Sequence, residues 1–225
     1  MLRFPLFLAL VLLFAACGDD ATDVADAAST TSIAPATAPS KPVAEPDFFT
    51  FVPGRRFGKI SKFTTGGQMS ELYGDDVEPT TDIQLGEGTR TGGYLLYPGT
   101  KNQAEIMLPD EGSGISRLTV RIAGKDSDWR LAGSELRIGT TLAELEEMNG
   151  KPFELSGYEW DNGGTVTDWK GGKLKDIGVV TSYGGGGSGS RGIDRSVIGD
   201  QLISSDNPAL DTIGVTVSSV SIVFR

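Results

Sequence analysis

Carboxylates are the main candidates for acid–base chemistry in this chain, because its 225 residues include no histidine and one cysteine, Cys17. Histidine is the commonest general base and metal ligand, so its absence argues against most hydrolase triads and against a zinc site. Two carboxylates at a suitable separation can hydrolyse a glycosidic bond. Glu159 and Asp168 are our example of such a pair, although nothing in the sequence favours them over other carboxylates. The sequence predicts no resident metal and no cofactor.

Two other patterns resemble ligand sites without meeting their requirements. The glycine-rich run after Tyr183 contains Gly187-x-Gly189-x-x-Gly192, but a dinucleotide fingerprint needs a helix that opens at its last glycine, and residues 193–197 favour no helix. Short acidic clusters in predicted turns lack the distal glutamate of a calcium loop. They are Asp75-Asp76, Asp126-Ser127-Asp128 and Asp161-Asn162.

Cys17 indicates where the protein is located. One cation, Arg3, precedes an apolar run from Phe4 to Ala16, which is the outline of a secretory signal and too short for a spanning helix of about 20 residues. The end of this run, Phe14-Ala15-Ala16-Cys17, resembles a bacterial lipobox, although Phe14 replaces the usual leucine. The resemblance implies cleavage before Cys17, which would carry the lipid, and Gly18 favours the outer membrane over the inner one. Plain secretion, or a short anchor that is never cut, is the alternative.

The remainder divides into a tether and a folded part. Residues 18–46 are rich in Ala, Ser, Thr, Pro and Asp and lack aromatic residues, so they are predicted to be a disordered tether that spans about 30 Å. Residues 47–225 contain enough apolar residues for a core. The formal net charge of −10 argues against nucleic acid as a partner.

The folded part is predicted to contain one structural unit twice, over about residues 55–124 and 131–225. Residues 60–74 align with residues 136–150 without a gap. Each segment carries a capping box, Thr65-x-x-Gln68 or Thr141-x-x-Glu144, and then a glycine that can end a helix. Matched positions are Ile60 with Leu136, Thr65 with Thr141, Gln68 with Glu144, Met69 with Leu145, Leu72 with Met148, and Gly74 with Gly150.

A hairpin and a further strand are predicted after each helix. In the first unit, strands 94–97 and 104–108 follow an insertion, residues 75–93, and strand 117–122 comes next. In the second, Asn162-Gly163 is the two-residue turn of a hairpin over residues 153–169, followed by strand 177–180. This predicts an α+β fold, a tandem repeat of strand–helix–hairpin–strand units with antiparallel sheet and short helices on one face.

Two further features are predicted near the C-terminus. The apolar alternation of residues 215–224 changes parity at Ser218-Ser219, which predicts a β-bulge there. Asn207-Pro208 is typical of the start of a short helix through Leu210.

The second hairpin is rich in aromatic side chains. A two-residue turn would place Trp160 opposite Thr165, Tyr158 opposite Thr167 and Ser156 opposite Trp169, so that Tyr158, Trp160 and Trp169 share one face. Such a cluster is either core beneath the helices or an exposed recognition patch, because aromatic residues dominate both. We take Tyr158, Trp160 and Trp169, together with Trp129, as candidate binding residues.

Three stretches of the folded part resemble a group of uncharacterised bacterial envelope lipoproteins. They are Val52–Ile60, Arg137–Leu145 with Asn149–Phe153, and Gly163–Val166. The duplicated helix-and-sheet unit is also similar to the β-lactamase-inhibitor protein and to the small lipoprotein of the outer-membrane barrel-assembly machine. These likenesses imply binding of a protein through a sheet face and carry no activity.

The sequence therefore predicts a lipid-anchored, non-enzymatic module of the bacterial cell envelope that binds an envelope protein. It would contact the membrane through the lipid on Cys17. The alternatives are a carboxylate-dependent hydrolase of envelope glycan and a purely structural envelope lipoprotein.

Overall fold

The computed structural model describes residues 48–110, 112, 115–184 and 193–225, which belong to one compact unit of the chain. The predicted signal with Cys17, the tether and most of the glycine-rich run lie outside the described residues. No helix among the residues described is both long and apolar enough to span a membrane.

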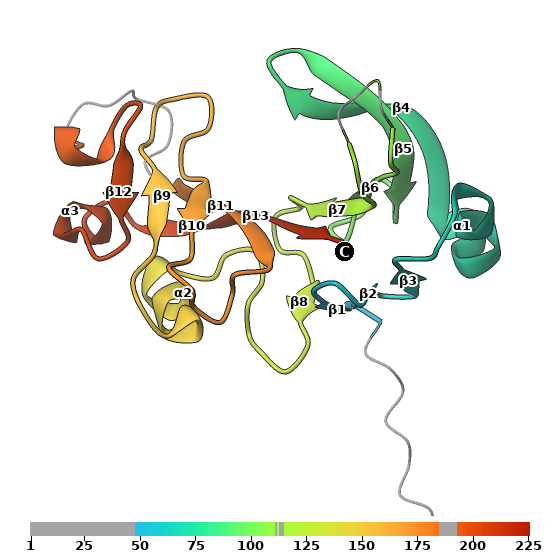
Figure 1. The fold of residues 1–225 in the computed structure, drawn as a ribbon, viewed down its shortest axis with the longest axis horizontal. Coiled ribbons are helices and arrows are strands. Elements are labelled where there is room, and N and C mark those ends of the chain that lie inside the picture. The colour runs from blue at the N-terminus through green and yellow to red at the C-terminus, as the bar shows by residue number, and fades with distance from the viewer. Residues whose placement is uncertain (1–47, 111, 113–114, 185–192) are drawn as a thin grey trace, which may run out of the picture. The chain divides into compact units, whose positions relative to one another are not determined.

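Six antiparallel strands form the largest sheet, in the order β11-β13-β7-β6-β5-β4 (Figure 1). Their bounds are β4 Val77–Gly86, β5 Thr89–Leu96, β6 Ala104–Met107, β7 Thr119–Ile122, β11 Ile177–Tyr183 and β13 Val215–Val223. Residues 75–93, predicted to be an insertion between helix and hairpin, contain β4 and the first part of β5, which pair along a long hairpin. Thr, Ile and Val residues in this segment suit a pleated strand.

Two smaller sheets complete the fold. One has the order β3-β2-β1-β8 and the other β10-β9-β12. Their strands are β1 Thr50–Val52, β2 Arg56–Phe57, β3 Ile60–Ser61, β8 Arg130–Leu131, β9 Glu154–Ser156, β10 Val166–Asp168 and β12 Leu202–Ser204. The β1–β8 pair is parallel, whereas the sequence predicts only antiparallel sheet. The α+β class is confirmed, with mostly antiparallel sheets and short helices.

Both predicted capping boxes are present. In α2, Leu142–Asn149, the Oε2 atom of Glu144 accepts from the backbone N–H of Thr141 at 2.8 Å, and the Glu144 N–H donates back to the Thr141 hydroxyl at 3.3 Å. In α1, Gly66–Tyr73, Gln68 Oε1 accepts from the Thr65 N–H at 3.0 Å. These bonds satisfy amide groups that the first helical turn leaves without partners.

The glycines that end the two helices differ. Gly150 adopts the left-handed conformation expected of it, with φ 82° and ψ 6°. Gly74 has φ 57° but ψ −126°, and the chain continues into a short 3-10 helix, Gly74–Asp76, before β4.

The predictions for the C-terminal segment are confirmed. Val180 pairs with Ser219 and Thr181 with Val217, which leaves Ser218 as the extra residue of a bulge. The apolar residues on both sides of it are consequently all buried, namely Val215, Val217, Val220, Ile222 and Phe224. Asn207 caps α3, Pro208–Asp211, through its side chain, with proline at the first helical position.

The predicted duplication is not confirmed by the sheets. The hairpin and the next strand of the first unit, β5, β6 and β7, are neighbours in one sheet. In the second unit the hairpin β9–β10 joins β12, and β11 pairs with β13 in the large sheet. One hydrophobic core nevertheless includes side chains from all three sheets, among them Phe51, Val120 and Leu155.

Replacing Thr141 by alanine should lower the free energy of unfolding by about 1 kcal/mol at pH 7, because the cap of α2 loses its hydroxyl. Hydrogen bonds from Thr141 hold the pKa of Glu144 below its usual 4.5. A carboxyl with a lowered pKa in the folded state stabilises the fold above its unfolded pKa, and this stabilisation is lost as the pH falls through the folded pKa. Part of the cost of Thr141→Ala should therefore vanish once the pH falls below the folded pKa of Glu144, measured by urea unfolding at pH 7 and at a pH well below 4.5.

Thr65→Ala provides the matched control. Its capping partner, Gln68, does not titrate, so the cost of this change should be the same at both pH values. Equal pH dependence of the two variants would contradict a role of the Glu144 charge in the cap.

Candidate functional site

The predicted register of the aromatic hairpin is wrong. Leu155 pairs with Val166 and Glu154 with Asp168, and each strand has only three residues, with a loop that joins them. The Gly157 and Tyr158 N–H groups donate to Gln201 and Val197 at 2.9 and 2.8 Å. Because these residues bond another segment, the strand cannot extend to Trp160 as the sequence predicts.

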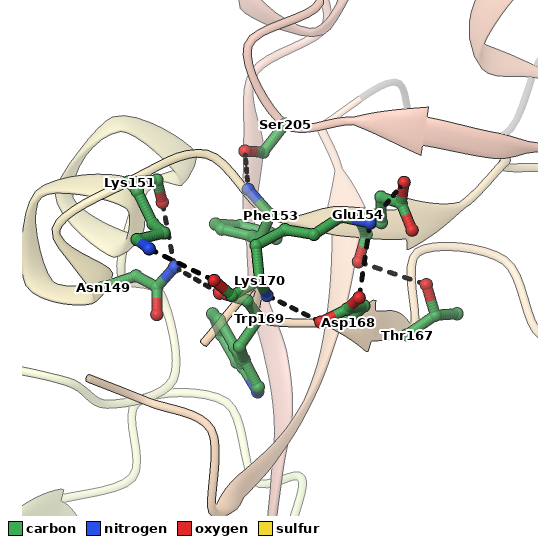
Figure 2. Close-up of polar contacts among 9 residues, drawn as sticks. All are labelled: Asn149, Lys151, Phe153, Glu154, Thr167, Asp168, Trp169, Lys170 and Ser205. Carbon is green, nitrogen blue, oxygen red and sulfur yellow. Dashed lines mark hydrogen bonds and ion pairs between the residues drawn. The ribbon is translucent and has the colours of Figure 1, made fainter. Parts of the chain in front are cut away.

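Trp169 is a core residue. Its side chain is buried, its Nε1–H donates to the Ile177 carbonyl oxygen at 2.8 Å, and its ring lies 4.8 Å from that of Phe153. Figure 2 shows Asn149, at the end of α2, donating through Nδ2 to the carbonyl oxygens of Lys151 at 2.9 Å and Trp169 at 3.2 Å. The buried Asn149 amide thus connects helix α2 to the chain that follows β10.

Tyr158 is also buried. Its hydroxyl lies 2.7 Å from the Thr181 hydroxyl on β11, and its ring meets that of Tyr183 edge-on at 5.2 Å. Burial raises the pKa of Tyr158 to about 12. This residue contributes to packing between β11 and the hairpin loop.

Trp129 lies in the hydrophobic core, directly before strand β8. Its ring stacks on Phe57 with a centroid distance of 3.8 Å, and its Nε1–H donates to the Asn102 carbonyl oxygen at 2.9 Å. The buried indole has no surface to offer a partner.

Trp160 alone of the four candidates is accessible, with 54% of its surface exposed. The preceding residue, Glu159, has φ 62°, a left-handed conformation that interrupts the alternation of an extended strand. Tyr158 is consequently buried while Trp160 is exposed, and the predicted cluster of three aromatic rings on one face does not form.

The two suspected catalytic carboxylates have separate partners. Asp168 is paired with Lys170, which also binds Glu154 at 2.7 Å (Figure 2). Hydrogen bonds from the backbone and side chain of Lys170 lower the pKa of Asp168. Glu159 accepts a hydrogen bond from the Tyr183 hydroxyl, which raises the pKa of that tyrosine. A glycosidase acid needs a raised carboxyl pKa, and Asp168 has the opposite shift.

A pocket of about 640 Å³ lies at one end of the large sheet, where β6 and β13 end and β7 begins. We call it the sheet-end pocket. The loop between β3 and α1 forms another wall of the pocket. The lining residues are Lys62, Phe63, Thr64, Thr65, Gly66, Leu108, Pro109, Ser116, Arg117, Leu118, Phe224 and Arg225.

The floor of this pocket is apolar. Leu118 and Phe224 are 5% and 3% exposed, and the Phe224 N–H donates to the Leu118 carbonyl oxygen at 3.0 Å. Leu108 packs against the same core. Phe63, on the wall of the pocket, is 78% exposed, which is more than any other large hydrophobic side chain in the described part of the chain. Recessed apolar residues with an exposed aromatic ring beside them are typical of ligand and protein docking sites.

The charged side chains that line the pocket are all cationic, namely Lys62, Arg117 and Arg225. Gly66, another lining residue, is the first residue of α1, where the helix dipole carries partial positive charge. The sheet-end pocket therefore suits an apolar group that carries negative charge.

Sequence reasoning did not find this site. Its three cations come from separate segments, and only the pairing of β13 with β7 brings residues 224–225 beside residues 117–118. The one local signal was Lys62-Phe63, a cation and an aromatic residue in a polar loop before a helix cap.

Comparisons with protein-family models, with curated proteins and with solved structures find no match to this chain. Within the described part of the chain, no group of three or more acidic or cysteine side chains is placed to hold a metal ion.

Trp169→Ala should lower the free energy of unfolding by about 3–5 kcal/mol, because it removes a packed ring from the core. Trp160→Ala should change it by no more than about 0.5 kcal/mol, since that ring is exposed. Urea unfolding of both variants followed by far-ultraviolet circular dichroism tests this difference. Equal costs would show that the two rings have similar surroundings in solution.

Proposed function

We propose that this protein is a lipid-anchored, non-enzymatic module of the bacterial cell envelope that binds another envelope protein through the sheet-end pocket. The anchor would be lipid on Cys17, and residues 18–46 would be the tether between the bilayer and the domain. The outer membrane is the favoured location because Gly18 follows the cysteine.

The observation that carries this proposal is the composition of the sheet-end pocket. It combines a recessed apolar floor, the exposed Phe63 ring and three cations in a chain whose formal net charge is −10. Aromatic and arginine side chains around a desolvated pocket are the usual anchors of protein interfaces. The pocket thus takes the place of the aromatic hairpin as the proposed binding surface, although Trp160 stays available to a partner.

A non-enzymatic role agrees with the chemistry of the chain. Histidine is absent, and the suspected carboxylates are held by different partners, Lys170 and Tyr183. No observation favours the glycan hydrolase over binding. The duplicated origin of the two capped helices and a purely structural role both stay predictions.

Cys17→Ala should abolish lipid attachment and release the protein from the membrane fraction, because the acceptor sulfur is lost. Cell fractionation and mass spectrometry of the N-terminal peptide measure this result. A wild-type N-terminus without acyl chains would contradict the anchor, while leaving the pocket hypothesis intact.

A photo-reactive amino acid at position 63 of the full chain should crosslink in living cells to one envelope protein. The same probe at position 202 is the matched control, because Leu202 is 65% exposed and lies on β12. The purified partner should then bind wild-type protein and lose binding to Phe63→Asp. Equal adducts at both positions, or no protein adduct at position 63, would contradict the proposed site.

A further inference from the structure

The charge around the sheet-end pocket is opposite to that of the whole chain. The sequence has 20 basic and 30 acidic residues, yet the pocket is lined by Lys62, Arg117 and Arg225 and by no carboxylate side chain. Like-signed charges on one cleft focus its electrostatic potential and attract a ligand of opposite sign. These cations favour an anionic group at the pocket, although the chain as a whole is acidic.

The cations are accessible to a ligand. Lys62 and Arg117 are exposed, and the Lys62 ammonium lies 5.1 Å from the centre of the neighbouring Phe63 ring. Arg225 is paired with Asp176 at 2.8 Å, and both side chains are substantially exposed. An exposed pair of this kind contributes about 0–1 kcal/mol, so Arg225 can exchange Asp176 for a ligand carboxylate at little cost.

The shape of the pocket distinguishes between anionic ligands. Leu118 and Phe224 are recessed below the surface, so the flat face of a bilayer cannot contact them. A side chain that projects from a peptide can reach these two residues. The floor consists of the side chains of Leu108, Leu118 and Phe224, so an apolar group that enters the pocket is surrounded by apolar side chains.

We propose that the sheet-end pocket recognises an acidic–apolar peptide segment, in which an aromatic or branched apolar side chain fills the floor. Carboxylates beside that side chain would pair with Lys62 and Arg117, and the arginine fork can bind a carboxylate through two hydrogen bonds. This inference rests on the proposed function and specifies the chemistry of the partner. The polar groups of Thr64, Thr65 and Ser116 line the same pocket and can bond the peptide backbone.

The test is selection of random seven-residue peptides, displayed on a cell surface, against the purified full-length protein in detergent. Enriched peptides should carry Asp or Glu within two residues of an aromatic or branched apolar residue. Synthetic copies of these peptides should bind the Lys62→Glu/Arg117→Glu variant at least about tenfold more weakly than they bind the wild-type protein. Their affinity for the wild-type protein should fall as the salt concentration rises. Lys125→Glu is the matched control, because Lys125 is exposed and does not line the pocket.

Any of the following outcomes would contradict the inference. Enrichment of basic or uncharged peptides, or equal binding to the double variant and to Lys125→Glu, would show that the cations do not select the ligand. Displacement of the photo-crosslink at position 63 by oleate but by no acidic peptide would assign the pocket to a lipid. A specific protein crosslink at position 63 that the double charge reversal leaves unchanged would retain the proposed function and reject this peptide chemistry.

Discussion

Strand β13 connects the two halves of the fold. It pairs with β7 along residues 220–223 and with β11 along residues 215–222, so the last strand of the chain lies between strands from the first and second halves. Its apolar residues are buried on one face because the bulge at Ser218 corrects their alternation. The shared core and the sheet-end pocket both depend on this pairing.

The position of β13 also explains why the pocket has its composition. Phe224, which follows β13, donates its N–H to Leu118, which precedes β7, and Arg225 and Arg117 line the same pocket. Strand ends leave space that the sheet itself cannot fill, and here the β3–α1 loop closes one side of it with Lys62 and Phe63. An apolar floor and a cationic rim arise at the same place because four segments of the chain converge there.

The aromatic residues show how burial separates structural from binding roles. Trp129, Tyr158 and Trp169 each have a polar atom in a hydrogen bond within the protein, with the Asn102 carbonyl, the Thr181 hydroxyl and the Ile177 carbonyl. A buried aromatic ring whose polar atom is satisfied internally stabilises the core. Phe63 has the opposite setting, on a loop between a short strand and a helix cap, where its ring is mostly exposed.

The amino-acid sequence by itself determined the features that depend on near neighbours. Both capping boxes, the left-handed Gly150, the cap at Asn207 and the bulge at Ser218 were predictable because each depends on residues a few positions apart. Tertiary structure decided the rest. The register of β9 and β10 differs from the predicted one because Gly157 and Tyr158 bond residues 197–201. The division into three sheets and the pocket require contacts between distant segments. Such contacts have no local pattern, since any strand with a suitable apolar face can pair with several others.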